Sequence, residues 1–255
     1  MLAQERYEII LEMLESDKIV KVGKLCSLFN VSIETVRRDL EYLENEGKLK
    51  RIYGGAVPNK KTSVEPTYSA RYTKNLEEKR NIGRRTSELI SDGETLIIDL
   101  GTTTLEVARH LKNKKNLTVI TNCINIAQEL VGVSGNRVIL TGGILRPGEL
   151  ALSGIFSEEF ISAFNVDKTI LGVGGITISE GISDYHLEEA RVRKLMIEKG
   201  SQVIAVADHC KFGVKALVNV CPLEKIDVLV TDDKLPKKIL DDYRNCPIEV
   251  IVASK

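Results

Sequence analysis

The sequence predicts an α/β protein in two parts, an N-terminal winged helix-turn-helix and a C-terminal domain built on a largely parallel sheet. In residues 1–57, three segments with helical spacing of apolar residues precede a short β-type run that contains two glycines. From residue 94 onward, short apolar runs alternate with helical segments, which is typical of parallel strands covered by helices. Residues 58–75 contain two prolines and little apolar periodicity. We therefore predict a DNA-binding domain at 1–57, a linker at 58–75 and a sensor domain at 76–255.

Composition restricts the class of protein. The 255 residues suffice for two domains. Lys+Arg and Asp+Glu both number 36, which excludes a uniformly basic nucleic-acid coat but permits a local DNA-binding face. The five cysteines include no C-x-x-C pair, so we expect reduced thiols, no metal site and no cofactor. The chain lacks a signal-peptide pattern and any run of about 20 apolar residues, so we expect a cytoplasmic protein with no membrane span.

The first domain is expected to hold three helices. Apolar periodicity predicts helices at 2–16, 21–29 and 33–46. Ser32 is the predicted N-cap of the third helix, because its hydroxyl can accept a hydrogen bond from a free first-turn amide. Gly47 is predicted to end that helix. Residues 48–57 then predict a short hairpin, or wing.

The third helix is the predicted reading helix, since it must enter the DNA major groove, which is about 12 Å wide. With Val36 at the centre of the buried face and about 100° per residue, Arg38 points most directly outward. We expect Arg38 and Thr35 to contact base edges, and Arg37 and Ser32 to contact phosphates. The predicted wing contacts are Lys48, Lys50, Arg51 and Tyr53.

A simpler interpretation of this segment is a plain three-helix bundle. Its arginines would then form ion pairs along the helix with Glu34, Asp39 or Glu41.

The second domain is expected to alternate strands and helices after a helix at 76–90. The predicted strands are 96–100, 117–121, 137–143, 168–175, 202–208, 227–232 and 248–253, and further helices are expected at 103–111, after Asn122, at 186–200 and at 236–243.

Residues 31–56, VSIETVRRDLEYLENEGKLKRIYGGA, resemble the signature of the DeoR family of bacterial repressors. The family's second region is matched by DLGTTT at 99–104, TN at 121–122, TGG at 141–143 and DHCKFG at 208–213. The resemblance implies a winged helix-turn-helix joined to an effector domain that resembles sugar-phosphate isomerases. It also implies repression of a sugar or polyol operon through double-stranded operator DNA, with release by a phosphorylated sugar or polyol.

A phosphate site is also predicted by the residues themselves. Gly101 after a strand lets the backbone approach an anion, and the helix-start amides and threonine hydroxyls beyond it can donate to its oxygens. A tight turn capped by a threonine is the alternative. Other polar or glycine turns also follow strands, whose carboxyl ends meet at one edge of the sheet. The predicted effector-binding residues are Asp99, Gly101, Thr102, Thr103, Thr104, Thr121, Asn122, Gly142, Gly143, Gly174 and Lys211.

Some of these residues have simpler interpretations. Lys211 would supply positive charge at this edge, or be an ordinary solvated lysine. Asp99 would accept from a sugar hydroxyl or cap the next helix. Asp184, His186 and Glu188 begin a predicted helix, where Asp184 is explained as an N-cap and His186 as a surface residue.

Two positions depart from the family pattern. Many members carry an acidic residue in place of Gly174, at a position that corresponds to catalytic acids of the related isomerases, so we expect no enzyme activity. Members commonly have serine in place of Cys210. The run 184–186, Asp-Tyr-His, resembles glycerol-3-phosphate-type repressors.

Two other functions remain as alternatives. One is an isomerase-like enzyme with an added DNA-binding module. The other is a redox or metal sensor using Cys26, Cys123 or Cys210, which their spacing does not favour. For the repressor we expect a homodimer or homotetramer, because two symmetric modules read two half-sites.

Overall fold

The structure, a computed structural model, describes residues 2–17, 19–46, 48–58 and 64–254. The chain divides into two compact units, Met1–Lys61 and Thr62–Lys255. The first has one hydrophobic core and the second has two. Across the described ranges, no helix is long and apolar enough to cross a membrane.

The N-terminal unit is the predicted winged helix-turn-helix. Asn30 in the left-handed conformation ends the second helix, and Ser32 caps the third. Gly47, the predicted end of the third helix, lies outside the described residues. A Cβ at Gly55 would lie 2.0 Å from the carbonyl oxygen of Val20, so the close approach of two strands requires glycine there. The elements are α1 (Ala3–Asp17), β1 (Val20–Lys21), α2 (Val22–Phe29), α3 (Ile33–Asn45), β2 (Leu49–Ile52) and β3 (Gly55–Pro58), with the strands in the antiparallel order β1-β3-β2.

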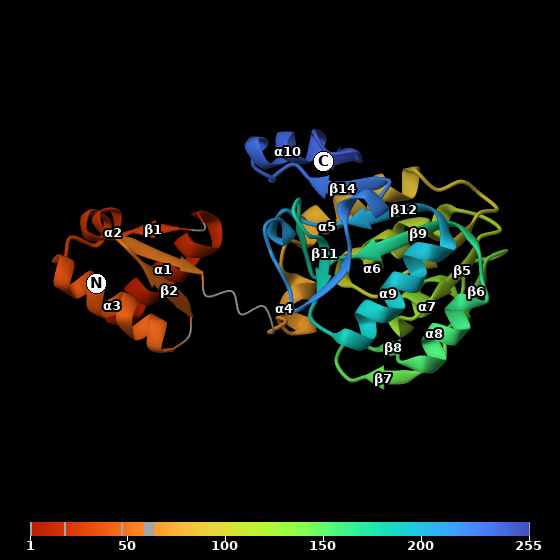
Figure 1. Ribbon diagram of the computed structural model, residues 1–255, viewed down its shortest axis with the longest axis horizontal. Coiled ribbons are helices and arrows are strands. Elements are labelled where there is room, and N and C mark those ends of the chain that lie inside the picture. Colours follow the sequence, from red (N-terminus) through yellow and green to blue (C-terminus); the bar gives the residue numbers. More distant parts are fainter. Residues whose placement is uncertain (1, 18, 47, 59–63, 255) are drawn as a thin grey trace. The chain divides into compact units, whose positions relative to one another are not determined.

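A seven-stranded sheet, parallel throughout, forms the centre of the second unit (Figure 1). This confirms the parallel sheet that the apolar runs predict. Its strand order is β15-β14-β12-β9-β4-β5-β6. The strands are β4 (Thr95–Ile98), β5 (Thr118–Thr121), β6 (Arg137–Leu140), β9 (Val166–Gly172), β12 (Gly200–Val206), β14 (Val228–Asp232) and β15 (Glu249–Ala253).

Helices cover both faces of this sheet, because alternate strand residues point to opposite sides. Leu96 and Ile98 join one buried cluster and Ile97 the other. The first cluster includes residues of α5 (Leu76–Glu88), α6 (Thr102–His110) and α7 (Ile124–Leu130). The second includes residues of α8 (Ile155–Ser162), α9 (Leu187–Lys199) and α10 (Lys237–Arg244).

Part of the predicted linker is helical and belongs to the second unit. Helix α4 (Tyr68–Thr73) begins where the Thr67 hydroxyl accepts from the Ala70 amide at 3.4 Å. Six residues are too few for a periodic apolar pattern, so the sequence did not predict this helix. Residues 59–63 of the same segment lie outside the described residues.

Small antiparallel sheets were also not predicted. They comprise β7 (Ile144–Arg146) with β8 (Ala151–Ser153), and β10 (Gly175–Thr177) with β11 (Gly181–Asp184) and β13 (Val218–Cys221). The 3-10 turns are η1 (Leu111–Asn113), η2 (His209–Lys211) and η3 (Leu223–Lys225).

Candidate DNA-binding surface and effector site

The start of the reading helix is fixed by Ser32. Its Oγ accepts from the Thr35 amide at 3.2 Å and lies 3.1 Å from the Thr35 Oγ1. Both hydroxyls therefore sit at the N-terminal end of α3, where a reading helix contacts bases and phosphates.

The arginines of α3 are available to a ligand. Arg37 and Arg38 are exposed, and within the described residues neither makes an ion pair. Asp39 is instead held by Arg6, whose Nε and Nη2 donate to its carboxylate at 2.6 and 2.9 Å in a buried pair. Within the described residues, Arg37 and Arg38 therefore do not form the ion pairs along the helix that a plain three-helix bundle would have.

The predicted wing contacts are exposed, and one of them is also bonded within the first unit. Lys48, Lys50 and Tyr53 are exposed. Arg51, also exposed, joins β2 to α3: its Nε donates to the Glu44 carboxylate at 2.6 Å and its amide donates to the same carboxylate at 2.7 Å. These bonds hold the pKa of the Glu44 carboxyl below its usual value.

In the second unit, α6 begins without a side-chain cap. Gly101 has φ 148° and precedes the helix. Within the described residues, the amides and hydroxyls of Thr102 and Thr103 have no hydrogen-bond partner, whereas the Thr104 hydroxyl donates to the Gly101 carbonyl at 3.0 Å. The alternative of a threonine-capped turn is therefore not observed. The start of α6 presents unused donors, as an anion site requires.

The side chains of Thr121 and Asn122 form hydrogen bonds within the protein and so support this turn. The Asn122 Oδ1 accepts from the Leu100 amide at 3.1 Å, and its Nδ2 donates to the Leu152 carbonyl at 3.3 Å. The Thr121 hydroxyl accepts from the Cys123 amide at 3.1 Å. Both residues are fully buried, so they hold the backbone around α6 in place.

Asp99 lies where the strand ends, but its carboxylate does not face open solvent. Its Oδ2 accepts from the Arg193 Nε at 2.5 Å and from the Gly172 amide at 3.2 Å. Burial raises the pKa of Asp99, against the opposing effect of Arg193. Arg193 also pairs with Asp184, so one buried guanidinium joins two carboxylates. We therefore interpret Asp99 as a support of the site, which differs from the predicted acceptor of a sugar hydroxyl.

The segment that begins α9 also differs from its prediction. The Asp184 Oδ1 accepts from the His186 amide at 3.3 Å and from that of Tyr185. The N-cap position of α9 is His186, which makes no side-chain cap bond. Asp184 thus closes a turn before the helix and is not its cap.

Lys211 is half-buried in η2, which follows β12. Burial lowers the pKa of its amine, and Asp208 opposes that effect. The sequence did not indicate Arg71 and Lys79, which are also cationic. Arg71 lowers the pKa of the Lys211 amine, and the pKa of Lys79 falls to about 8, mainly through burial, with further lowering by Lys211 and Arg71. Lys211 is therefore not an ordinary solvated lysine, because it is half-buried and has other cations near it.

Of the remaining glycines, Gly143 and Gly174 leave little space for a side chain, whereas a Cβ at Gly142 would meet nothing within 4 Å. A Cβ at Gly174 would lie 2.7 Å from the Ser183 carbonyl oxygen, so this backbone has no room for an acidic residue there. Gly143, with φ 132°, packs against Ser153, and the Gly142 carbonyl accepts from the Ser157 hydroxyl. These two glycines hold β8 and α8 in place after the edge strand β6.

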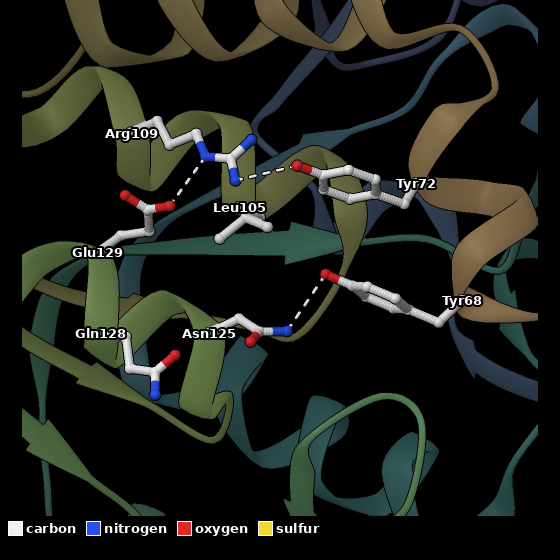
Figure 2. A pocket seen from close by; sticks show the side chains of 7 residues that line it. All are labelled: Tyr68, Tyr72, Leu105, Arg109, Asn125, Gln128 and Glu129. Atoms are coloured by element: carbon white, nitrogen blue, oxygen red, sulfur yellow. Dashed lines mark hydrogen bonds and ion pairs between the residues drawn. The ribbon is translucent and has the colours of Figure 1, made fainter.

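A pocket of about 430 Å³ lies between α4, α6 and α7 (Figure 2). The Tyr72 hydroxyl accepts from the Arg109 Nη2 at 3.2 Å, and the Asn125 Nδ2 donates to the Tyr68 hydroxyl at 3.2 Å. Arg109 also donates to Glu129 at 3.0 Å. Tyr72 is thus bonded to the last turn of α6, and Tyr68 to the first turn of α7.

Comparison with known proteins agrees with this architecture. Residues 6–62 match the model of the DeoR-like helix-turn-helix domain, and residues 74–233 match that of the DeoR C terminal sensor domain. The chain is 32% identical to the HTH-type transcriptional regulator GolR of Listeria innocua, over 98% of each chain. It is 35% identical to the glycerol-3-phosphate regulon repressor of Escherichia coli, over 92% of this chain and 93% of that one.

Among solved structures, ribose 5-phosphate isomerase A of Methanocaldococcus jannaschii aligns with 56% of each chain, at a TM-score of 0.41 and 13% identity. The two family models together span both units, and the relatives match nearly end to end. The chain therefore belongs to the DeoR family of DNA-binding transcriptional regulators.

Proposed function

We propose that the protein represses an operon of sugar or polyol metabolism and leaves its operator when a phosphorylated sugar or polyol binds the second unit. The uncapped start of α6 carries this proposal. There the amides and hydroxyls of Thr102 and Thr103 have no partner within the described part of the chain.

The chemistry of this edge suits a phosphate. Amides at a helix start and threonine hydroxyls donate to phosphate oxygens, and the helix dipole favours negative charge. Lys211 adds positive charge on the turn after β12, at the same edge of the parallel sheet as α6. Burial disfavours the charged form of Lys211. A bound phosphate would stabilise that charged form.

The first unit would supply the operator contacts. Arg38 and Thr35 would contact base edges, and Arg37, Ser32 and the wing lysines would contact the backbone. One such module buries too little surface for tight specific binding. We therefore propose a homodimer or homotetramer that reads two half-sites, which sedimentation at micromolar concentration would show.

The same site offers poor support for catalysis. Arg193 holds Asp99, and the backbone around Gly174 has no space for an acidic side chain. An isomerase needs a placed acid or base to move a proton. We therefore propose a binding role for this site and no turnover of the effector.

A ligand panel tests the proposal on the full chain. Glycerol 3-phosphate, glucose 6-phosphate and fructose 6-phosphate would each be compared with the unphosphorylated parent by thermal shift. We expect one phosphorylated compound to raise the melting temperature by mass action, and its parent to leave it unchanged. The same compound should weaken binding to DNA upstream of the gene in a mobility-shift assay. The proposal would be contradicted if the parent and the phosphate ester raised the melting temperature equally. It would also be contradicted if a bound ester left the affinity for DNA unchanged.

A further inference from the structure

The chain that joins the two units in sequence lies across the second unit as a strap, residues 64–75. Its helix α4 is bonded to α6 and α7 through Tyr72 and Tyr68 (Figure 2). Its last residue, Asn75, donates to the Asp208 carboxylate at 3.1 Å, beside the turn that carries Lys211. The strap is therefore bonded to the helix whose start carries the proposed effector site, and to the η2 turn that carries Lys211.

The first part of the strap is held by one carboxylate. The two oxygens of Glu65 lie 3.2 Å from the Arg71 Nη2, 3.0 Å from the Arg146 Nη1 and 3.1 Å from the His186 Nε2. The Glu65 side chain is only 14% exposed. Burial raises the pKa of Glu65, but Arg71 and Arg146 bring it below its usual value, so Glu65 is held as an anion.

The cations that hold Glu65 have little capacity for another anion. Arg71 also pairs with Glu149, and Arg146 lies 2.5 Å from Glu189 and 3.8 Å from Glu149. Three carboxylates thus share two arginines. Burial, together with the nearby carboxylates, raises the pKa of Glu189 to about 7, as expected of a crowded acidic group.

The effector phosphate and Glu65 depend on overlapping positive charge. The Lys79 Nζ donates to the carbonyl oxygens of Arg71 and Lys74, and Asn75 of the strap donates to Asp208 on the turn that carries Lys211. In this neighbourhood Arg71, which binds Glu65, lowers the pKa of the Lys211 amine, and Glu65 raises it. A phosphate that approaches Lys211 from the start of α6 would be repelled by Glu65 and attracted by Arg71. Occupancy by both anions is therefore unfavourable, because like charges in a partly buried site repel strongly.

We propose that Glu65 is a latch that competes with the effector phosphate for this positive charge, so that phosphate binding expels Glu65 and loosens the strap. This inference rests on the proposed effector site at α6. In sequence the strap lies between the DNA-binding unit and the rest of the second unit, so its release would lengthen the stretch of chain that joins them. A longer connection no longer holds paired reading helices at one half-site spacing, which couples effector binding to operator release.

Hydrogen exchange on the full chain with inorganic phosphate tests the latch. In the wild type, saturating phosphate should speed exchange of the α4 amides. Glu65→Gln keeps the shape and removes the charge, so its α4 amides should exchange rapidly without phosphate, and it should bind phosphate about 5-fold more tightly because the internal competitor is gone. Glu188→Gln is the matched control, since Glu188 is an exposed carboxylate on α9 and should behave as the wild type.

Thr103→Val separates the latch from the effector site. If this variant loses phosphate binding while Glu65→Gln changes neither phosphate affinity nor α4 exchange, the latch is overturned and the effector site stands. If Thr103→Val binds phosphate as the wild type does, the proposed site at α6 is wrong, and the latch that depends on it is overturned too.

Discussion

The Arg193 Nε donates to the Asp99 Oδ2 at 2.5 Å, and both side chains are at least 95% buried. The same guanidinium pairs with Asp184, so it joins α9 to the end of β4 and to β11. Because these carboxylates have been removed from water, the guanidinium is the group that compensates their charge.

Removal of that guanidinium should destabilise the second unit. Arg193→Met keeps most of the volume but leaves two buried carboxylates without a cation, which costs about 3–5 kcal/mol of the free energy of unfolding. Urea denaturation of the full chain measures the loss. Arg191→Met on the exposed face of the same helix is the control and should change stability by less than about 0.5 kcal/mol. Equal losses in the two variants would show that the buried pairs do not support the fold.

The Arg193 pairs show where prediction from sequence ends. The turn of Gly101 and three threonines has a local signature, because glycine and helix-start donors adjoin in the chain. The Asp99–Arg193 pair joins residues 94 positions apart, and no local pattern marks such a partner. Sequence therefore predicted the strand-to-helix turn, while the orientation of the Asp99 carboxylate emerged only with the tertiary fold.

Helices and strands also divide into those with a local sequence pattern and those that depend on distant contacts. Helix α3 and strand β12 have strong apolar periodicity and a clear cap or run, and both were predicted close to their observed bounds. Helix α4 is stabilised mainly by tyrosine and arginine contacts to distant elements, so its segment resembles a linker in sequence. Arg51 is predicted to contact DNA because it is a basic residue of the wing. Its bond to Glu44 depends on how β2 packs against α3, which the sequence does not indicate.

The two kinds of DNA contact should separate by mutation. Arg38→Ala should weaken operator binding by about 1–3 kcal/mol and relax base choice at one position, because Arg38 is placed to reach base edges. Lys50→Ala should weaken operator and random DNA alike and flatten the salt dependence. Binding isotherms on both DNAs at several salt concentrations make the measurement. Identical behaviour of the two variants on both DNAs would contradict these roles.

The His209–Asp232 pair should give stability that depends on pH. The His209 Nδ1 lies 2.8 Å from the Asp232 Oδ1, and this bond raises the pKa of His209 to about 10 from 6.5. A raised folded pKa means that the stabilisation is complete below about pH 6.5, declines above it and is lost as pH passes about 10. His209→Gln should therefore cost about 1.5–3 kcal/mol at pH 6 and progressively less toward pH 10. A cost that is constant over this range, in urea titrations at each pH, would show that the histidine is not charged in the folded state.

The final prediction concerns the effector response. Thr103→Val keeps the side-chain shape and removes a hydroxyl donor, and Lys211→Met removes the positive charge on the turn after β12. Each change should weaken effector binding by about 1.5–3 kcal/mol, as expected of hydrogen bonds to a charged group. Neither residue lies in the DNA-binding unit, so both variants should bind the operator as the wild type does without effector.

The sign of that response follows from linkage. A ligand shifts an equilibrium only by its differential affinity for two states. Weaker effector binding must therefore raise the effector concentration needed for release by the same factor, about 10- to 150-fold. The measurement is operator affinity over an effector titration for the wild type and both variants. Lys238→Met, which removes an exposed charge from α10, is the control and should release at the wild-type concentration. Release of both site variants at that same concentration would place the phosphate elsewhere on the second unit.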